Sequence, residues 1–258
     1  MAPLPVIETS KPTLSSNDSA VLQALFDAES SLSNKNANTD TALPKLPNIS
    51  ESEIASLQAR ELQAIQRLQV SPEEHLSSET INTAISELSA IINDNPRYAP
   101  AYLNRAQAIR LLIDARQPYS SSASENSPNV PLSTLLFENL SKTIALLTPE
   151  SSESLISPFH SRTLASAYTH RAYILYKVAR SKDEKEKAYD REHLLPLPLQ
   201  DLSDERLEDM ASFDFQLGGR YGNEAAKQMA VGTNPYAKMC GAIVQDAMKA
   251  EIAQWNGA

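Results

Sequence analysis

Apolar residues recur at intervals of three and four along most of the chain, the spacing that places them on one face of an α-helix. These stripes are separated by stretches rich in Pro, Ser, Asn or charged residues, which are typical of loops. The clearest stripe is the last, where positions 236, 239, 240, 243, 244, 247 and 248 are all apolar. The pattern therefore predicts an all-α protein made of amphipathic helices.

The stripes predict where the helices lie. Expected helices cover about 54–68, 81–93, 98–115, 132–147 and 159–181, followed by 207–217 and a short one at 223–230. The pair Gly218-Gly219 is expected to end the helix that begins near Leu207, because glycine is a poor helix former. A charged, Pro-containing insert, 182–205, precedes that helix. Its first residues, 182–187, alternate in sign and predict a solvated helix end.

The composition of the segments predicts the domain organisation. Residues 1–16 are rich in Pro, Ser and Thr and are expected to be disordered. A short helix is expected at 17–29, then a linker at 30–51, a helical array at 52–233 and a capping helix at 234–254. Within the array, the units run over about 52–96, 97–149 and 158–222. One hypothesis is that the helix at 18–28 docks on the array as a built-in ligand; the alternative is that it caps the first unit.

An internal echo supports a repeated architecture. The sequence Ala-Tyr-Leu-Asn-Arg-Ala at 101–106 returns as Ala-Tyr-Thr-His-Arg-Ala at 167–172, 66 residues later. Repeated helix segments are typical of stacked helical hairpins, and such stacks usually bind other proteins. The expected fold is a short α-α superhelix of three helical hairpins, with a capping helix at its C-terminal end and a flanking helix at its N-terminal end.

The hairpins resemble tetratricopeptide repeat (TPR) units, although the copies are farther apart than the usual ~34 residues. Two flanking motifs and one repeat motif are similar to the family of tetratricopeptide repeat protein 36: Asn-Asp-Ser-Ala-Val-Leu-Gln-Ala-Leu-Phe at 17–26, Asn-Pro-Tyr-Ala-Lys-Met-Cys at 234–240 and Asn-Arg-Ala-Gln-Ala-Ile-Arg at 104–110. The resemblance implies three TPRs, no enzymatic activity, and a protein-binding role linked to the Hsp70 chaperone.

The chaperone link can be tested on individual residues. Many TPR proteins hold the acidic C-terminal tail of Hsp70 or Hsp90 with Lys, Arg and Asn side chains in the groove. Here the expected cations fall on Glu61, Ser166 and His170, one expected Asn falls on Ile65, and only Asn104 matches. An intact carboxylate clamp is therefore not expected, and the groove favours a ligand that is not strongly acidic. The predicted groove residues are Glu61, Ile65, Asn104, Gln107, His170 and Tyr173.

The charge and composition narrow the function further. A net charge of −9 and a pI near 5.0 argue against nucleic acid or a membrane as partner. The single cysteine, Cys240, excludes internal disulfides and lies on an apolar stripe, as a buried structural residue would. The four histidines are scattered over separate segments, so neither a metal nor a cofactor is expected. The chain has no secretory signal or long apolar run, which predicts a cytoplasmic protein, with a nuclear pool left open.

The sequence favours a monomeric, non-catalytic scaffold or adaptor that binds a peptide or helix. Its expected partner is a protein, with an Hsp70-type chaperone and a metabolic enzyme as the two candidates. The alternative is an enzyme or regulatory subunit with a site in the insert of the third unit, near His193 and Asp201. A deep cavity with convergent ionisable groups would favour that alternative.

Overall fold

The computed structural model describes residues 36–47, 49–69, 76–115, 131–151, 153–234 and 249. Over these residues the regular structure is helical, with only an isolated bridge between Thr39 and Ile156. The all-α prediction is confirmed. The expected disordered segment 1–16, the helix at 17–29 and nearly all of the capping helix at 234–254 lie outside the described residues.

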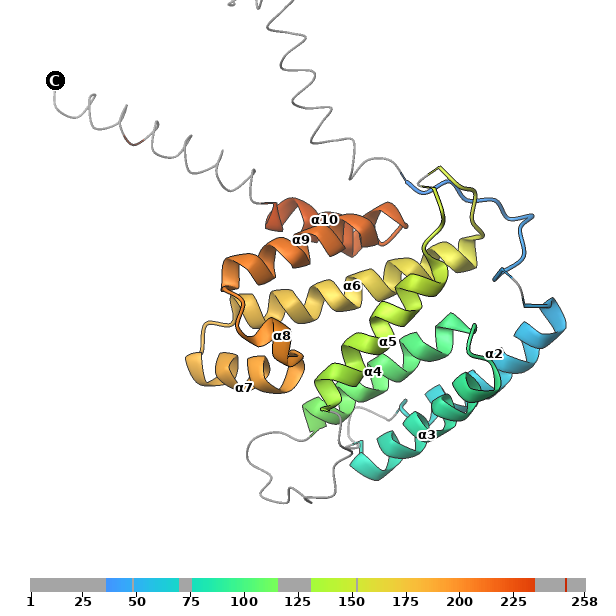
Figure 1. Cartoon of the computed structure of the whole chain (residues 1–258), viewed down its shortest axis with the longest axis horizontal. Helices are drawn as coiled ribbons and strands as arrows, with labels where there is room; N and C mark the ends of the chain where they lie inside the picture. The colour runs from blue at the N-terminus through green and yellow to red at the C-terminus, as the bar shows by residue number, and fades with distance from the viewer. Residues whose placement is uncertain are drawn as a thin grey trace, which may run out of the picture.

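The helices follow one another as stacked pairs. Their bounds are α2 (Glu51–Gln66), α3 (Ser78–Asp94), α4 (Ala99–Ala115), α5 (Leu132–Leu147), α6 (Pro158–Arg180), α7 (Glu184–Leu194), α8 (Leu197–Gln200), α9 (Asp204–Arg220) and α10 (Glu224–Thr233). Hairpins form from α2 with α3, α4 with α5, and α6 with α9, and each hairpin packs on the next (Figure 1). The insert α7–α8 interrupts the third hairpin, and α10 packs on α9.

Serine residues define where several helices begin. Ser50, Ser77, Ser157 and Ser203 are the N-cap residues of α2, α3, α6 and α9, and each hydroxyl accepts a hydrogen bond from the backbone N–H three residues later. Such caps satisfy N–H groups that have no partner within the helix, and each contributes about 1 kcal/mol. These four serines thus fix where α2, α3, α6 and α9 begin.

The core consists of two clusters of buried residues that join the hairpins. One lies around α2, α3 and the start of α4, with Tyr98 and Leu88 fully buried. The other lies between α4, α5, α6 and α9, around Leu136 and Phe215. Alanines of the echo, such as Ala106 and Ala172, are fully buried and allow neighbouring helices to approach closely. The stack therefore has a continuous apolar interior, as expected for hairpins that cannot bury their faces alone.

The glycine pair in α9 corrects one sequence prediction. Gly218 and Gly219 do not end the helix, which continues to Arg220. A Cβ on Gly218 would lie 2.6 Å from the Thr169 hydroxyl oxygen, and one on Gly219 would lie 2.7 Å from a side-chain carbon of Lys227. The glycines are needed because α6 and α10 pack tightly against this turn, and Gly222, at φ 100°, makes the turn instead.

Residues 36–47 and 49–50 of the expected linker form a strap along the array (Figure 1). The Ala37 N–H donates to the Arg220 carbonyl, the Asp40 N–H donates to the Ile156 carbonyl, and the Ser157 hydroxyl donates to the Lys45 carbonyl. Leu46 and Ile49 of the strap are buried in the core. The strap therefore ties the start of α2 to the start of α6 and the end of α9.

Candidate functional site

The two arginines of the echo make equivalent contacts in successive hairpins. Arg105 on α4 donates from Nε to the Asn139 side-chain oxygen on α5 at 2.9 Å. Arg171 on α6 donates from Nε and Nη2 to the two carboxylate oxygens of Asp214 on α9, at 2.7 and 2.8 Å. Each guanidinium carbon also lies 5.7 Å from the ring centroid of the tyrosine three residues earlier. The repeated arginine therefore connects the first helix of each of these two hairpins to the second helix.

A hollow of about 450 Å³ lies between the first helices of the three hairpins, α2, α4 and α6. We call it the groove. It is lined by Gln58, Glu61, Leu62, Ile65, Pro100, Leu103, Asn104, Phe159, Arg162, Thr163 and Ser166. Four of the positions that correspond to a carboxylate clamp, Glu61, Ile65, Asn104 and Ser166, thus lie at this one hollow.

The floor of the groove carries a buried carboxylate. Glu61 is only 8% exposed, and it accepts hydrogen bonds from the Tyr98 hydroxyl at 2.5 Å and from the Asn104 side-chain amide. Burial raises the pKa of Glu61, and the two hydrogen bonds oppose that rise without overcoming it. The pKa of Tyr98 is raised by burial and by the adjacent carboxylate. Asn104 therefore donates to the chain's own Glu61, where a clamp would use it for the ligand.

The predicted groove residues divide into two sets. Glu61, Ile65 and Asn104 line the groove, whereas Gln107, His170 and Tyr173 do not. Gln107 is exposed, and the half-exposed Tyr173 ring lies 5.9 Å from the Arg110 guanidinium carbon. The sequence reasoning missed Leu62, Phe159 and Arg162, which line the same hollow. For Leu62 a signal was available in the sequence, because an apolar residue stands there between the polar residues Glu61 and Gln63.

His170 is a partly buried histidine whose ring nitrogens are shielded from solvent, and it does not line the groove. Neither ring nitrogen has a hydrogen-bond partner in the described part of the chain. Burial and then the nearby Arg110 lower the pKa of His170 to about 4, so the ring is neutral at physiological pH. It supplies no positive charge for an acidic ligand.

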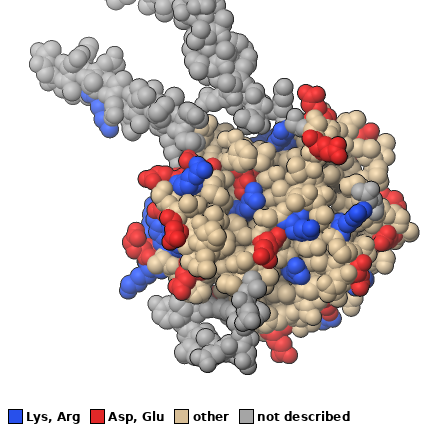
Figure 2. All heavy atoms as spheres, in the orientation of Figure 1, with Lys and Arg blue, Asp and Glu red and all other residues tan. Residues whose placement is uncertain are grey.

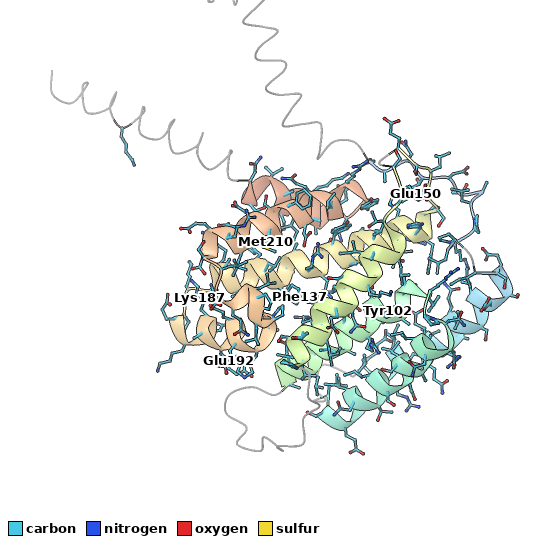
Figure 3. The ribbon with its side chains drawn as sticks, in the orientation of Figure 1. Tyr102, Phe137, Glu150, Lys187, Glu192 and Met210 are labelled. Atoms are coloured by element: carbon cyan, nitrogen blue, oxygen red, sulfur yellow. The ribbon has the colours of Figure 1, made fainter. Side chains whose placement is uncertain are left out.

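A second hollow, also of about 450 Å³, lies where α8 approaches α5, α6 and α9. We call it the α8–α9 hollow. Its residues are Phe137, Arg171, Leu175, Leu199, Arg206, Asp209, Met210, Phe213 and Asp214. Phe137 and Met210, on α5 and α9, are labelled in Figure 3. The Arg171–Asp214 pair of the echo is part of its lining.

The surface charges on the side viewed in Figure 2 are mixed. Acidic and basic side chains are interspersed over the described residues, with no large area of one sign (Figure 2). The described residues contain no cluster of three or more His, Cys, Asp or Glu side chains that could hold a metal ion. No helix among them is both long enough and apolar enough to cross a membrane.

The alternative site in the insert has a different environment from the one expected. The ring of His193 stacks on Tyr189, with centroids 4.0 Å apart, and the His193 side chain is exposed. Asp201, at the end of α8, is exposed as well. Neither residue lines the groove or the α8–α9 hollow. Leu194 and Leu195 of the insert are buried, and Asp190 pairs with Lys177 on α6 at 2.9 Å, so the insert packs on the array.

The fold and the groove define the chain as a stack of helical hairpins with a hollow along its first helices. No family model matches the chain, and no solved structure matches it. It is similar to the L-tyrosine degradation gene cluster protein hmgX of Aspergillus fumigatus strain Af293, with 46% identity over 259 residues that cover 98% of each chain. The chain belongs to the family of that protein.

This relative overturns the resemblance to tetratricopeptide repeat protein 36. A match at 46% identity over nearly the whole chain outweighs three short motifs. Those motifs are seven to ten residues long and consist largely of residues that are common in helices or at helix ends. The chaperone link came with that resemblance and loses its support.

Proposed function

We propose that the protein is a non-catalytic scaffold that binds an enzyme of tyrosine degradation and holds a non-acidic segment of that enzyme in the groove. The observation that carries the proposal is the buried Glu61 carboxylate on the groove floor, bonded to Tyr98 and Asn104. It defines which ligands the groove accepts.

The charge of Glu61 acts against acidic ligands. Two like charges about 4 Å apart repel by about 4 kcal/mol at an effective dielectric constant of about 20. That energy corresponds to roughly a thousandfold loss of affinity. Because one N–H of the Asn104 amide already donates to Glu61, at most one N–H is left for a ligand. The groove is therefore unsuited to the acidic tail that a carboxylate clamp takes.

The groove walls suit a polypeptide segment with apolar side chains. Leu62 is 53% exposed at the edge of the groove, with Ile65, Leu103 and Phe159 beside it. Arg162 lines the groove, is exposed, and makes no ion pair with any described residue. An apolar surface with a few polar groups at its edge is typical of a protein-binding site.

The choice of partner draws on the relative. That protein's name associates it with a gene cluster for L-tyrosine degradation and specifies no reaction. A hairpin stack with a groove for a polypeptide supports a role on an enzyme of the same pathway rather than a role as one of its catalysts.

The test uses two leucines that are matched in exposure. Leu62 lies in the groove and is 53% exposed, whereas Leu155 lies in the loop before α6 and is 59% exposed. The wild-type chain, Leu62→Asp and Leu155→Asp are each captured from native cells grown on tyrosine, and the tyrosine-degrading enzymes in the eluates are quantified. Wild type and Leu155→Asp are expected to retain one such enzyme, and Leu62→Asp to retain less than a tenth as much.

Two results would contradict the proposal. One is equal recovery of the enzyme with all three chains. The other is turnover of tyrosine or of one of its breakdown products by the purified protein alone, which would favour the enzyme alternative.

A further inference from the structure

The α8–α9 hollow has an apolar interior whose only charges are already paired. Phe137, Leu175, Leu199 and Met210 form its walls. Asp214 has a side chain only 4% exposed, and both of its oxygens accept from Arg171. The ion pair is therefore satisfied within the fold, and the interior offers no unpaired polar group to orient a small polar molecule.

The unpaired charges lie at the edge of the hollow. Arg206 and Asp209 are exposed, and neither side chain makes an ion pair or hydrogen bond with another described residue. Phe213 is 56% exposed on the same helix. An apolar centre surrounded by exposed charges is the arrangement of a protein–protein interface, whereas a metabolite site places its polar groups inside.

The exposed residues define the shape of the ligand. Arg206, Asp209 and Phe213 are three and four residues apart, so they form one stripe along about 10 Å of α9. The short helix α8 borders the hollow through Leu199 and leaves Leu197 69% exposed. A stripe of this kind matches a partner helix with the same spacing of charges and the opposite signs.

We propose that the α8–α9 hollow docks an amphipathic helix of a protein partner. One large apolar side chain of that helix enters the hollow beside Phe213, and an acidic and a basic residue one turn apart pair with Arg206 and Asp209. The docking site is separate from the groove, because the two hollows share no residue. This proposal therefore does not depend on the groove ligand.

Site-specific crosslinking identifies what occupies the hollow. A photo-crosslinking phenylalanine analogue is placed at position 213 of the full chain in native cells, and in a second chain at position 155 as the control. The crosslinked segment is identified by mass spectrometry and synthesised as a peptide. The expected result is an adduct, at position 213 only, with a helical segment of another protein that carries a large apolar residue flanked by one acidic and one basic residue.

The synthetic peptide is then titrated against purified full-length chains by fluorescence anisotropy. Phe213→Ala is expected to weaken binding by about tenfold or more, as for a central apolar contact. Arg206→Glu is expected to weaken binding by about fivefold. A peptide whose acidic residue is changed to lysine is expected to recover the lost affinity with this variant. Leu62→Asp leaves the affinity unchanged, which separates this site from the groove.

Several outcomes would overturn the proposal. They are an adduct with a second copy of this chain, the absence of any adduct specific to position 213, a crosslinked segment without the expected charges, or a peptide whose affinity Phe213→Ala does not alter. Because Phe213 is exposed, the variant is expected to keep its melting temperature, so a loss of binding is not a loss of folding.

Discussion

The two hollows each contain a buried carboxylate, and the partners of those carboxylates differ. Glu61 in the groove accepts hydrogen bonds from two neutral groups, the Tyr98 hydroxyl and the Asn104 amide. Asp214 in the α8–α9 hollow accepts two hydrogen bonds from the charged guanidinium of Arg171. Burial raises the pKa of both carboxyl groups, but only Asp214 has an opposite charge beside it.

The difference underlies our proposal that two hollows of similar volume take different ligands. In the groove the Glu61 carboxyl is bonded only to neutral groups, and we propose that this floor disfavours acidic segments. In the α8–α9 hollow Asp214 and Arg171 form a pair with no net charge, so we propose that the exposed charges of Arg206 and Asp209 select the partner. The following variants test that contrast, in order of expected effect.

Asp214→Ala is expected to have the largest effect on stability. It leaves the partly buried guanidinium of Arg171 without its charge partner, at a cost of about 3–5 kcal/mol in the free energy of unfolding. The matched change in the other hairpin, Asn139→Ala, removes one of the two neutral partners of Arg105, leaves the Ser89 hydroxyl, and is expected to cost about 1–3 kcal/mol. Urea denaturation measures both. Equal losses would show that the charge of Asp214 makes no difference.

His170, whose ring nitrogens have no hydrogen-bond partner among the described residues, extends the comparison to a group that becomes positively charged. The pKa of His170 is about 4 in the fold and about 6.5 in the unfolded chain, so protonation favours unfolding. Above pH 6.5 the ring is neutral in both the folded and the unfolded chain. As the pH falls from 6.5 towards 4, only the unfolded chain takes up the proton readily, so the free energy of unfolding decreases. The wild-type chain is expected to lose about 2 kcal/mol from this group between pH 7 and pH 5.

The test of that loss is His170→Leu, which cannot be protonated. The variant is expected to lose correspondingly less stability between the two pH values, as measured by urea denaturation at each. His193→Gln is the control, because it also removes one histidine but at an exposed position. An unchanged loss in His170→Leu would mean that this ring is not the group that titrates.

Glu61→Gln is expected to have a smaller effect, with the opposite pH dependence. Because the folded pKa of Glu61 is raised, its protonation favours folding, and the fold gains stability as the pH falls through that raised pKa. The glutamine variant lacks this gain and keeps an acceptor for Tyr98, so its stability at pH 7 should stay within about 1 kcal/mol of wild type. Melting temperatures across pH 4–8 test this, and a variant with the pH dependence of wild type would contradict it.

The smallest effects on stability are expected at the exposed apolar residues of the two hollows. Leu62→Asp and Phe213→Ala should each change the free energy of unfolding by less than about 0.5 kcal/mol, because both side chains are more than half exposed. Denaturation curves check this. A loss above about 2 kcal/mol in either variant would mean that the side chain supports the fold rather than a partner.

The parts of the molecule that follow from local pattern were predictable from the sequence. Periodicity located the hairpins, and the clamp positions read from the resemblance to TPR units fell on Glu61, Ile65 and Asn104, which line one hollow. The repeat also placed Arg105 and Arg171 at equivalent positions, and both contact the second helix of their hairpin.

The parts that depend on distant contacts were not predictable. No local signal pairs Ala37 with Arg220, so the strap read as a linker. Gly218 and Gly219 read as a helix end because the packing of α6 and α10 against them is invisible in the local sequence. His170 read as a groove residue because the alignment gives a position on a helix and does not give the depth of the side chain. The α8–α9 hollow depends on where the insert packs, which the charge pattern of 182–205 does not specify.

The most direct test is a calorimetric titration of the purified chain with the tyrosine-degrading enzyme that it captures. Leu62 and Leu155 are similarly exposed, and only Leu62 lines the groove. The scaffold role predicts that wild type and Leu155→Asp bind the enzyme with equal affinity, and that Leu62→Asp binds at least about tenfold more weakly. Equal affinity for all three chains, or no binding by the wild-type chain, would contradict it.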